Sequence, residues 1–290
     1  MSTILEEDGV LMQFSRILQG DILRCPVCKE KLTLDEAGKS LYCTGARRHC
    51  FDISAKGHVN LGLSHSGGGD SKEAVRSRTA FLRKGYYKPF ADKLCEILSE
   101  YVKEGLVIDA GCGEGYYTTL VAEKCGLDTV GFDLSKWGAE AGASNAKREG
   151  VNNVAFAVAS IYEMPVFDGC ADAVINLFAP CAEEEFKRVL KKDGILIVVG
   201  AGEDHLFGLK KAVYDNPYKN DLRGDLPTGM THVASHKISF DIELSDKEDR
   251  MNLFAMTPYF YRTSRADFEK LEKADGLITE VEFNVEVYRK

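Results

Sequence analysis

The stretch 106–115 limits the folds open to this chain more than any other. An apolar run is followed by Asp109 and then by three glycines at alternate positions, Gly111, Gly113 and Gly115. A short buried strand that ends in such a loop leaves bare backbone, which a nucleoside cofactor can approach because no side chain blocks it. The spacing is tighter than the G-x-G-x-x-G loop that seats a pyrophosphate, so it suits a cofactor without phosphate. A structural glycine-rich turn is the alternative.

A second strand, expected at 129–132, delivers Asp133, whose carboxylate could accept both hydroxyls of a ribose. Together the loop and this carboxylate predict a methyltransferase that uses S-adenosylmethionine (SAM). We expect the glycine loop at the methionine end of SAM, Leu134 at an adenine face and Ser160 at the adenine edge, while Asp109 orients the loop and the cofactor's amino group. The expected cofactor contacts are Asp109, Gly111, Cys112, Gly113, Gly115, Tyr116, Tyr117, Asp133, Leu134, Ser160 and Asn176.

Strand and helix patterns alternate from residue 106 onward, which predicts an α/β fold with a doubly wound, mostly parallel sheet. The last part of the chain departs from this alternation, and its two strands are expected to close the sheet as an antiparallel pair. We therefore predict the Rossmann-like SAM methyltransferase fold with seven strands. The expected strands are 106–109, 129–133, 154–158, 172–176, 194–199, 238–244 and 281–288. The expected helices are 71–85, one after Pro89, one from 116, 136–149, 182–191, 247–256 and 265–273.

Cysteines cluster near the N-terminus. Nine cysteines, an odd number, fit a reducing compartment better than a disulfide framework, so the cluster is interpreted first as a metal site. The spacing of Cys25, Cys28, Cys43 and His49 is that of a tetrahedral structural zinc centre, in a loop too small to fold on apolar burial alone. Cys50 competes with His49 for the fourth position. Unrelated buried thiols and a surface histidine are the alternative.

The length of 290 residues allows one α/β domain and a smaller partner. The Gly/Ser stretch 64–71 is expected to separate an N-terminal extension and zinc domain, 1–66, from the methyltransferase domain, 67–290. Residues 5–18 have a loosely helical spacing to which no function is assigned. No apolar run is long enough to span a bilayer and no signal layout is present, so we expect a cytoplasmic protein without a membrane partner.

A net charge of −8 argues against binding nucleic acid by overall charge, so such binding needs a local basic surface. The segment 71–93 has an excess of five positive charges and is expected to form a basic helix, although a solvated helix face has the same pattern. This basic helix, together with Arg47 and Arg48 of the zinc domain, would hold RNA between the two domains. The expected RNA-binding residues are Arg47, Arg48, Arg76, Arg78, Arg83 and Lys84.

Several motifs together give a more specific indication. They are Cys-Pro-x-Cys at 25–28, His-x-Phe-Asp at 49–52, Gly-x-Val-Asn-Leu at 57–61, an Arg…Phe-Leu motif at 78–82, the glycine loop extended to Thr118, Ala-Pro-Cys at 179–181 and His-Leu-x-x-Leu-Lys at 205–210. With these motifs the chain resembles the zinc-containing 23S rRNA (guanine-N1)-methyltransferases, the RlmA/RrmA family. The resemblance implies SAM and a structural zinc as cofactors, favours His49 as the fourth zinc ligand, and implies methylation of a guanine in a domain II hairpin loop of 23S rRNA. One branch of the family is linked to resistance to tylosin-type macrolides.

Catalytic groups are less clearly indicated. Asn176 follows the fourth strand and could polarise the guanine edge or merely cap the strand, and His205 could remove the N1 proton or be an ordinary core histidine. The partner expected is 23S rRNA, and a homodimer is left open. Two other functions are considered: a small-molecule SAM methyltransferase, which would share the motif 189–194, and a non-catalytic RNA-binding protein with the same fold.

Overall fold

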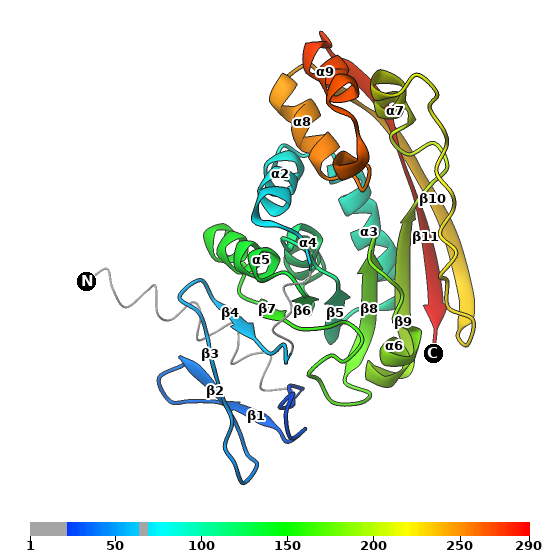
Figure 1. Cartoon of the computed structure of the whole chain (residues 1–290). Helices are drawn as coiled ribbons and strands as arrows, with labels where there is room; N and C mark the ends of the chain where they lie inside the picture. The colour runs from blue at the N-terminus through cyan, green and yellow to red at the C-terminus, as the bar shows by residue number, and fades with distance from the viewer. Residues whose placement is uncertain (1–21, 64–68) are drawn as a thin grey trace.

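The computed structural model describes residues 22–63 and 69–290, which form two sheets and the helices around them (Figure 1). The segment 5–18 lies outside the described residues. The strands are β1 (Leu32–Leu34), β2 (Ser40–Cys43), β3 (Cys50–Asp52), β4 (His58–Asn60), β5 (Leu106–Ala110), β6 (Asp128–Asp133), β7 (Val154–Val158), β8 (Ala171–Leu177), β9 (Leu190–Ala201), β10 (Thr231–Leu244) and β11 (Leu277–Arg289). The helices are α2 (Lys72–Arg83), α3 (Lys88–Tyr101), α4 (Tyr116–Cys125), α5 (Lys136–Glu149), α6 (Glu183–Val189), α7 (Phe207–Val213), α8 (Lys247–Ala255), the 3₁₀ turn η1 (Phe260–Arg262) and α9 (Arg265–Lys273). None of these helices is both long and apolar enough to cross a membrane.

The large sheet has the order β10-β11-β9-β8-β5-β6-β7-β4. Its strands are parallel from β4 to β9, and β11 and β10 then add in antiparallel pairing. Every residue of β5 and β7 is buried, which explains why these strands have continuous apolar runs rather than alternating ones. The predicted α/β fold with a mostly parallel sheet is confirmed.

The predicted number of seven strands is wrong, because β4 is an eighth strand on the large sheet. β4 pairs in parallel with β7, and the Leu61 amide extends the pairing by donating to the Val158 carbonyl at 2.9 Å. The strand has three residues, of which only Val59 is buried, so the sequence has no periodicity that could reveal it. Its role is to cover the edge of β7, whose backbone groups would otherwise lack partners.

Other differences from the predicted elements are local. Residues 190 and 191 belong to β9 instead of ending α6, so β9 starts four residues before its predicted start at 194, and β10 starts seven residues before its predicted start at 238. β10 is the outermost strand at one end of the sheet, and its first seven residues are largely exposed. These residues therefore have no apolar pattern that could have predicted them. The helix α7 was not predicted; it is one and a half to two turns long, too short for a clear helical period.

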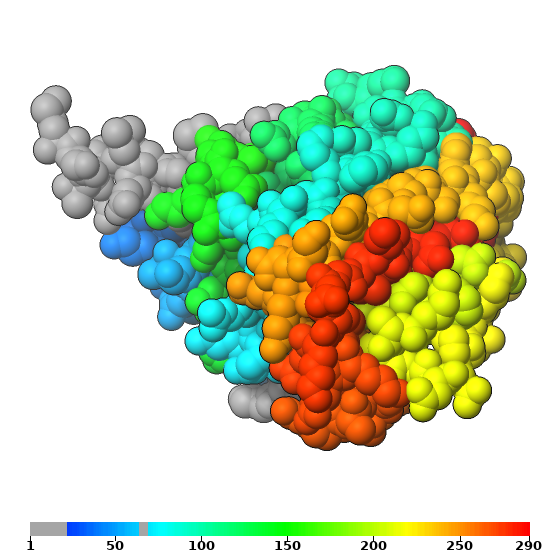
Figure 2. All heavy atoms as spheres, turned by 90° about the horizontal axis from the view of Figure 1, so that it is seen from above, coloured from blue at the N-terminus to red at the C-terminus, as the bar shows by residue number. Residues whose placement is uncertain are grey.

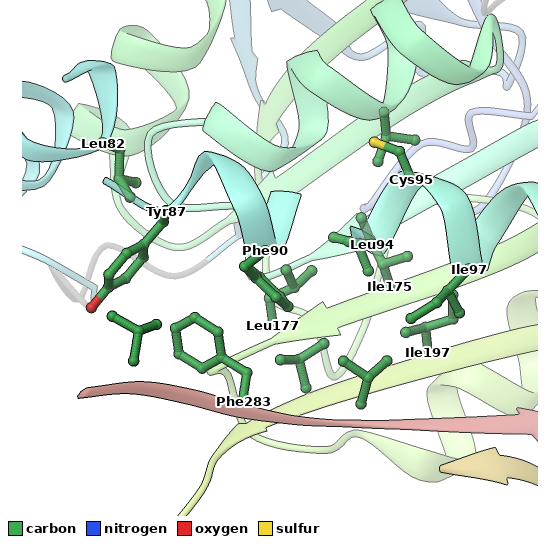
Figure 3. Packing of buried hydrophobic residues seen from close by; sticks show 14 of the residues in the cluster. Leu82, Tyr87, Phe90, Leu94, Cys95, Ile97, Ile175, Leu177, Ile197 and Phe283 are labelled. Carbon is green, nitrogen blue, oxygen red and sulfur yellow. The ribbon is translucent and has the colours of Figure 1, made fainter. Parts of the chain in front are cut away.

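One face of the large sheet holds an aromatic core. Phe90 of α3 and Phe283 of β11 face each other with ring centroids 4.5 Å apart, and both are fully buried (Figure 3). Leu94 and Ile97 continue the buried stripe of α3 along the sheet (Figure 3), and Tyr87 packs edge-on against Phe283 at the other end. This packing fixes α3 across the strands that lead into the glycine loop.

The opposite face is covered in part by the zinc module, residues 22–63. Ile22, Leu23, Leu32 and Leu41 of this module belong to the same buried cluster as Phe132 of β6. Backbone hydrogen bonds between the segments 22–24 and 165–167 join the module to the loop that follows β7. The module therefore shares its apolar core with the large sheet.

We expect Phe90→Ala to lower the free energy of unfolding by about 3–5 kcal/mol, because a fully buried ring is replaced by a cavity between α3 and β11. Urea unfolding followed by circular dichroism would measure the change. The control is Leu222→Ala, whose side chain is more than half exposed and should change stability by less than about 0.5 kcal/mol. Similar losses in the two variants would contradict this description of the core.

Candidate functional site

The glycine loop is attached to the end of β6 through its backbone. The amides of Gly111 and Cys112 donate to the Phe132 carbonyl at 2.8 and 3.1 Å. The Gly113 amide donates to Oδ2 of Asp133 at 2.9 Å, and the Ser135 amide donates to Oδ1 of the same carboxylate at 2.7 Å. The loop, β6 and the start of α5 are therefore held together by Asp133.

Two of the three glycines are required by close contacts. Gly111 has φ +91°, and a Cβ there would lie 2.5 Å from the Cβ of Ala179. Gly115 has φ +75°, and a Cβ there would lie 2.4 Å from the Phe156 ring. Because both the backbone angle and the space exclude a side chain, the loop leaves its backbone bare, as the sequence motif predicts.

Asp109 lies beneath this loop and is almost fully buried. The Thr118 hydroxyl donates to its Oδ2 at 2.6 Å, while Oδ1 has no hydrogen-bond partner among the described residues. Burial raises the pKa of Asp109 to about 7, although the Thr118 hydrogen bond favours the charged form. A buried acceptor without a donor fits the expected place of a cofactor's amino group.

Arg78 is part of this loop region rather than of an open surface. Its guanidinium forms ion pairs with Asp70 and, at 3.2 Å, with Glu114, which is 3 % exposed. Burial raises the pKa of Glu114, and the charge of Arg78 opposes that effect. The side chain of Arg78 also reaches Gly113, where a Cβ would lie 3.0 Å from its Nη1. The sequence placed Arg78 on an RNA surface; the structure places it against the glycine loop.

The other expected cofactor contacts divide into two groups. Ser160 lies beside Asp133, because the Ala159 amide donates to the Asp133 carbonyl at 3.0 Å, and Leu134 is 44 % exposed next to them. In contrast, the rings of Tyr116 and Tyr117 pack with the apolar cluster of α3, so their side chains point away from the loop.

Asn176 is fully buried and all its polar atoms have partners. Its Nδ2 donates to the carbonyls of Ala110, at 2.9 Å, and Pro180, at 3.2 Å, and its Oδ1 accepts from Arg223 at 2.9 Å. Asn176 thus ties the end of β5 to the Ala-Pro-Cys turn.

Arg223 is a positioning residue that sequence reasoning missed. Besides Asn176, its guanidinium donates to the carbonyls of Val199 and Ala179 at 3.2 and 2.7 Å. Asp225 accepts from Arg223 and also from the Cys181 amide, at 2.9 Å, so the two residues fasten the loop 214–230 to the turn 178–181. No sequence signal marks Arg223, because apart from the nearby Asp225 its partners are 24 to 47 residues away along the chain, and two of these three are backbone carbonyls.

His205 packs between aromatic rings instead of facing the glycine loop. Its ring centroid lies 4.6 Å from that of Phe283 and 6.3 Å from that of Tyr87. Its Nδ1 accepts from the Glu282 amide at 3.3 Å, and burial, with a smaller effect of Lys210, lowers the pKa of His205 to about 3. The nitrogen that would accept a proton is already used, so this geometry does not favour a general base.

The four residues expected to bind zinc lie together. One ligand atom from each of Cys25, Cys28, Cys43 and His49 is within 4.8 Å of the others. His49 Nδ1 is 3.5 Å from the sulfur of Cys25 and 3.4 Å from that of Cys43, and the sulfurs of Cys28 and Cys43 are 3.7 Å apart. Ligand atoms of a tetrahedral zinc site are about 3.5–3.8 Å apart, so the group fits the metal. Cys50 is exposed, with its sulfur beside Asp52.

The remaining basic residues differ in how free their charges are. Arg83 and Lys84 form ion pairs at 2.9 and 2.6 Å with carboxylates of α5 and α8. Arg47, Arg48 and Arg76 are exposed and form no ion pair with any described carboxylate. An RNA role for the six expected residues stays a prediction. Arg47, Arg48 and Arg76 are the three whose positive charge no described carboxylate neutralises.

Comparison with known proteins identifies the family. A family model described as "Methyltransferase domain" matches residues 102–257, and a zinc-ribbon model described as "RlmA, N-terminal" matches residues 23–62. YxjB of Bacillus subtilis (strain 168), provisionally named a 23S rRNA (guanine-N(1)-)-methyltransferase, is 33% identical over 234 residues, which are 76% of this chain and 79% of YxjB. The chain belongs to the RlmA family of methyltransferases.

Two further proteins are similar to this RlmA family member. The 23S rRNA (guanine(748)-N(1))-methyltransferase of Streptomyces fradiae is 31% identical over 198 residues, 66% of this chain and 67% of that enzyme. Among solved structures, the YcgJ protein from Bacillus subtilis covers 69% of this chain and 97% of its own, with 16% identity and a TM-score of 0.48. The predicted cofactors, SAM and a structural zinc, are confirmed by the family and agree with both sites.

Zinc content should distinguish the two candidates for the fourth ligand. We expect elemental analysis to find about one zinc per chain in the wild type and in Cys50→Ala, and a large loss of zinc in His49→Ala. Because the zinc module shares a buried cluster with the large sheet, His49→Ala should also lower the melting temperature of the whole chain. Retention of zinc by His49→Ala together with its loss from Cys50→Ala would reverse the assignment.

The buried carboxyl of Asp109 predicts a pH effect on stability. Since its pKa is about 7 in the folded chain, against 3.8 ordinarily, the folded state keeps a proton between about pH 4 and pH 7 that the unfolded state has lost. The contribution of Asp109 to the free energy of unfolding therefore falls as the pH rises through this window and is constant above it. In Asp109→Asn this fall should be absent. Urea unfolding from pH 4 to pH 8 would show curves that diverge up to pH 7, and parallel curves would contradict the prediction; the exposed Asp241→Asn is the control.

SAM affinity should depend on Asp133. We expect Asp133→Ala to weaken SAM binding by about 2–3 kcal/mol, because a charged acceptor for the ribose is lost together with the hydrogen bonds that hold Gly113 and Ser135. Isothermal titration calorimetry would measure this, with Asp241→Ala as the control on the exposed edge of the sheet. Affinity within a factor of two of the wild type would place the ribose elsewhere.

Proposed function

We propose that this chain transfers the methyl group of SAM to N1 of a guanine in a domain II hairpin loop of 23S rRNA, in the cytoplasm. The observation that carries the proposal is the combination of an intact glycine loop with an RlmA-type zinc ribbon packed on the same sheet. The zinc ribbon matters because it matches the N-terminal model of the RlmA family, whereas a small-molecule function would leave it unexplained. The relative from Streptomyces fradiae, by its name, methylates this type of atom in 23S rRNA.

The chemistry requires positioning more than covalent catalysis. SAM supplies an activated methyl group when bound, and guanine N1 becomes a good nucleophile only after it loses its proton. A guanine in a hairpin loop can be turned out of its stack at low cost, so the enzyme must hold the base in line and keep water away. Phe178 follows β8, has a strained φ of +55° and is 47 % exposed, which makes its ring a suitable contact for such a base.

Within this proposal Asn176 acts as a positioning residue. Its amide holds the carbonyls of Ala110 and Pro180, so it sets the distance between the glycine loop and the Ala-Pro-Cys turn rather than contacting guanine. His205 supports the aromatic core beside Phe283. Neither side chain is proposed to remove the proton from guanine N1, because the polar atoms of Asn176 and Nδ1 of His205 already have partners. We propose that this proton is lost to solvent as the base enters the site.

The RNA would approach over the edge where the parallel strands end, between the zinc module and α2. Arg47 and Arg48 on the module and Arg76 on α2 are the exposed cations proposed to contact its phosphates. We extend the proposal to resistance to tylosin-type macrolides, because one branch of the family is linked to it.

The test is incubation of the full-length protein with labelled SAM and unmodified 23S rRNA, followed by mapping of the methylated nucleotide. We expect label at N1 of one guanine in domain II, and far less label with Asp133→Ala at a SAM concentration near the wild-type Kd. Domain II RNA methylated at that guanine beforehand is the matched control and should accept no label. Label on another nucleotide or atom, or none on rRNA, would overturn the proposal.

A further inference from the structure

A groove runs between α2 and α5. The two helices lie side by side on the face seen from above, where α2 is cyan and α5 green (Figure 2). The groove has a volume of about 690 Å³ and opens to solvent. Its wall includes Lys72, Arg76, Arg83, Trp137, Glu140 and Arg148.

The groove is positively charged, and most of that charge is not neutralised. Lys72 and Arg76 are exposed and form no ion pair with any described carboxylate. Arg148 is held at 2.6 Å by the amide oxygen of Asn145, a neutral partner, whereas Arg83 is paired with a carboxylate. Among the described residues that line the groove, Glu140 is the one with an acidic side chain. In a chain with a net charge of −8, this is a local surface suited to a polyanion.

Trp137 gives the groove an aromatic wall. It is the only tryptophan of the chain and is half-buried, in the first turn of α5. The ammonium groups of Lys72 and Lys136 lie 4.9 and 4.5 Å from the centre of its ring. Proteins hold an unpaired nucleotide by an aromatic face with cations beside it, with the base on the ring and the phosphate on the cations.

The groove adjoins the cofactor site. Ser135, which precedes α5, bonds to Asp133 through its amide and to the Asp70 carbonyl through its hydroxyl, at 2.7 and 2.8 Å. Gly138, one residue after Trp137, packs so closely on the glycine loop that a Cβ there would lie 2.6 Å from the Gly113 carbonyl oxygen. A nucleotide on Trp137 would therefore be anchored within a few residues of the loop that holds SAM.

We propose that the groove between α2 and α5 is a binding site for a single-stranded nucleotide of the RNA substrate, with the base stacked on Trp137 and the neighbouring phosphates held by Lys72, Arg76 and Arg148. The proposal rests on the proposed function for the identity of the RNA. It adds a site outside the methyl-transfer centre, which anchors the strand that flanks the target guanine.

The single tryptophan allows a direct test with the full-length protein. An unmodified 23S rRNA domain II hairpin is titrated in the presence of saturating S-adenosylhomocysteine, so that any effect of the cofactor on Trp137 is already complete. We expect the hairpin to quench tryptophan fluorescence in a saturable way, with the same midpoint as binding measured on labelled RNA. A DNA duplex of equal length, which presents no unstacked base, should quench far less.

Variants separate stacking from charge. Trp137→Leu should raise the KM for RNA at least about fivefold while kcat and SAM affinity stay near wild type, and Trp137→Phe should recover most of the loss. The triple variant Lys72→Gln, Arg76→Gln, Arg148→Gln should weaken RNA binding and reduce the slope of log affinity against log salt by about 2, as expected for three phosphate contacts. Its matched control, with the same change of charge at the exposed Lys103, Lys192 and Arg289, none of which lines the groove, should bind RNA like the wild type.

The outcomes are distinguishable. If the protein methylates rRNA but the hairpin leaves Trp137 fluorescence unchanged, or if both triple variants bind RNA equally well, the groove proposal is wrong and the proposed function stands. Equal activity of Trp137→Leu and Trp137→Phe would refute stacking even if the charge variants behave as expected. If the protein neither binds nor methylates 23S rRNA, both proposals fall together.

Discussion

The carboxylate of Asp133 accepts one hydrogen bond from the glycine loop and one from the start of α5, and the cofactor end of the sheet depends on this double contact. Each partner follows a different parallel strand, so the contact fixes the spacing of two strand ends as well as the course of the loop. Burial raises the pKa of Asp133, an effect that its two backbone hydrogen bonds oppose. Because the loop is already ordered by the chain itself, cofactor binding needs little further ordering.

The charges near the glycine loop are also paired with one another. Arg78 balances the buried Glu114 and the nearby Asp70, so one cation serves to keep two acidic groups beside the bare backbone of Gly113. Counting charges along 71–93 gives a strongly basic segment, but part of that charge is used inside the protein. The surface that remains for a polyanion is narrower than the sequence indicates, and it is centred on the groove between α2 and α5 instead of on the whole helix.

The sequence predicts those parts of the fold and of the site that depend on residues close together in the chain. The strand 154–158 has the predicted bounds, because its apolar run and flanking residues carry the information. The spacing of the three cysteines and His49 placed four ligand atoms in one group for the same reason. In contrast, β4 exists because the edge of β7 needs a partner, and Arg223 matters because of carbonyls on distant strands. Such long-range requirements leave no trace in the residues nearby.

The apolar cluster common to the zinc module and the large sheet has a consequence for cells that are short of metal. Leu32 and Leu41 of β1 and β2 belong to that cluster, and the zinc ligand Cys43 ends β2, so the folding free energy that zinc contributes would also support this packing. A shortage of zinc would then reduce the number of folded molecules, while each folded molecule would keep its full turnover. The yield of enzyme, rather than its specific activity, would report the supply of zinc during synthesis.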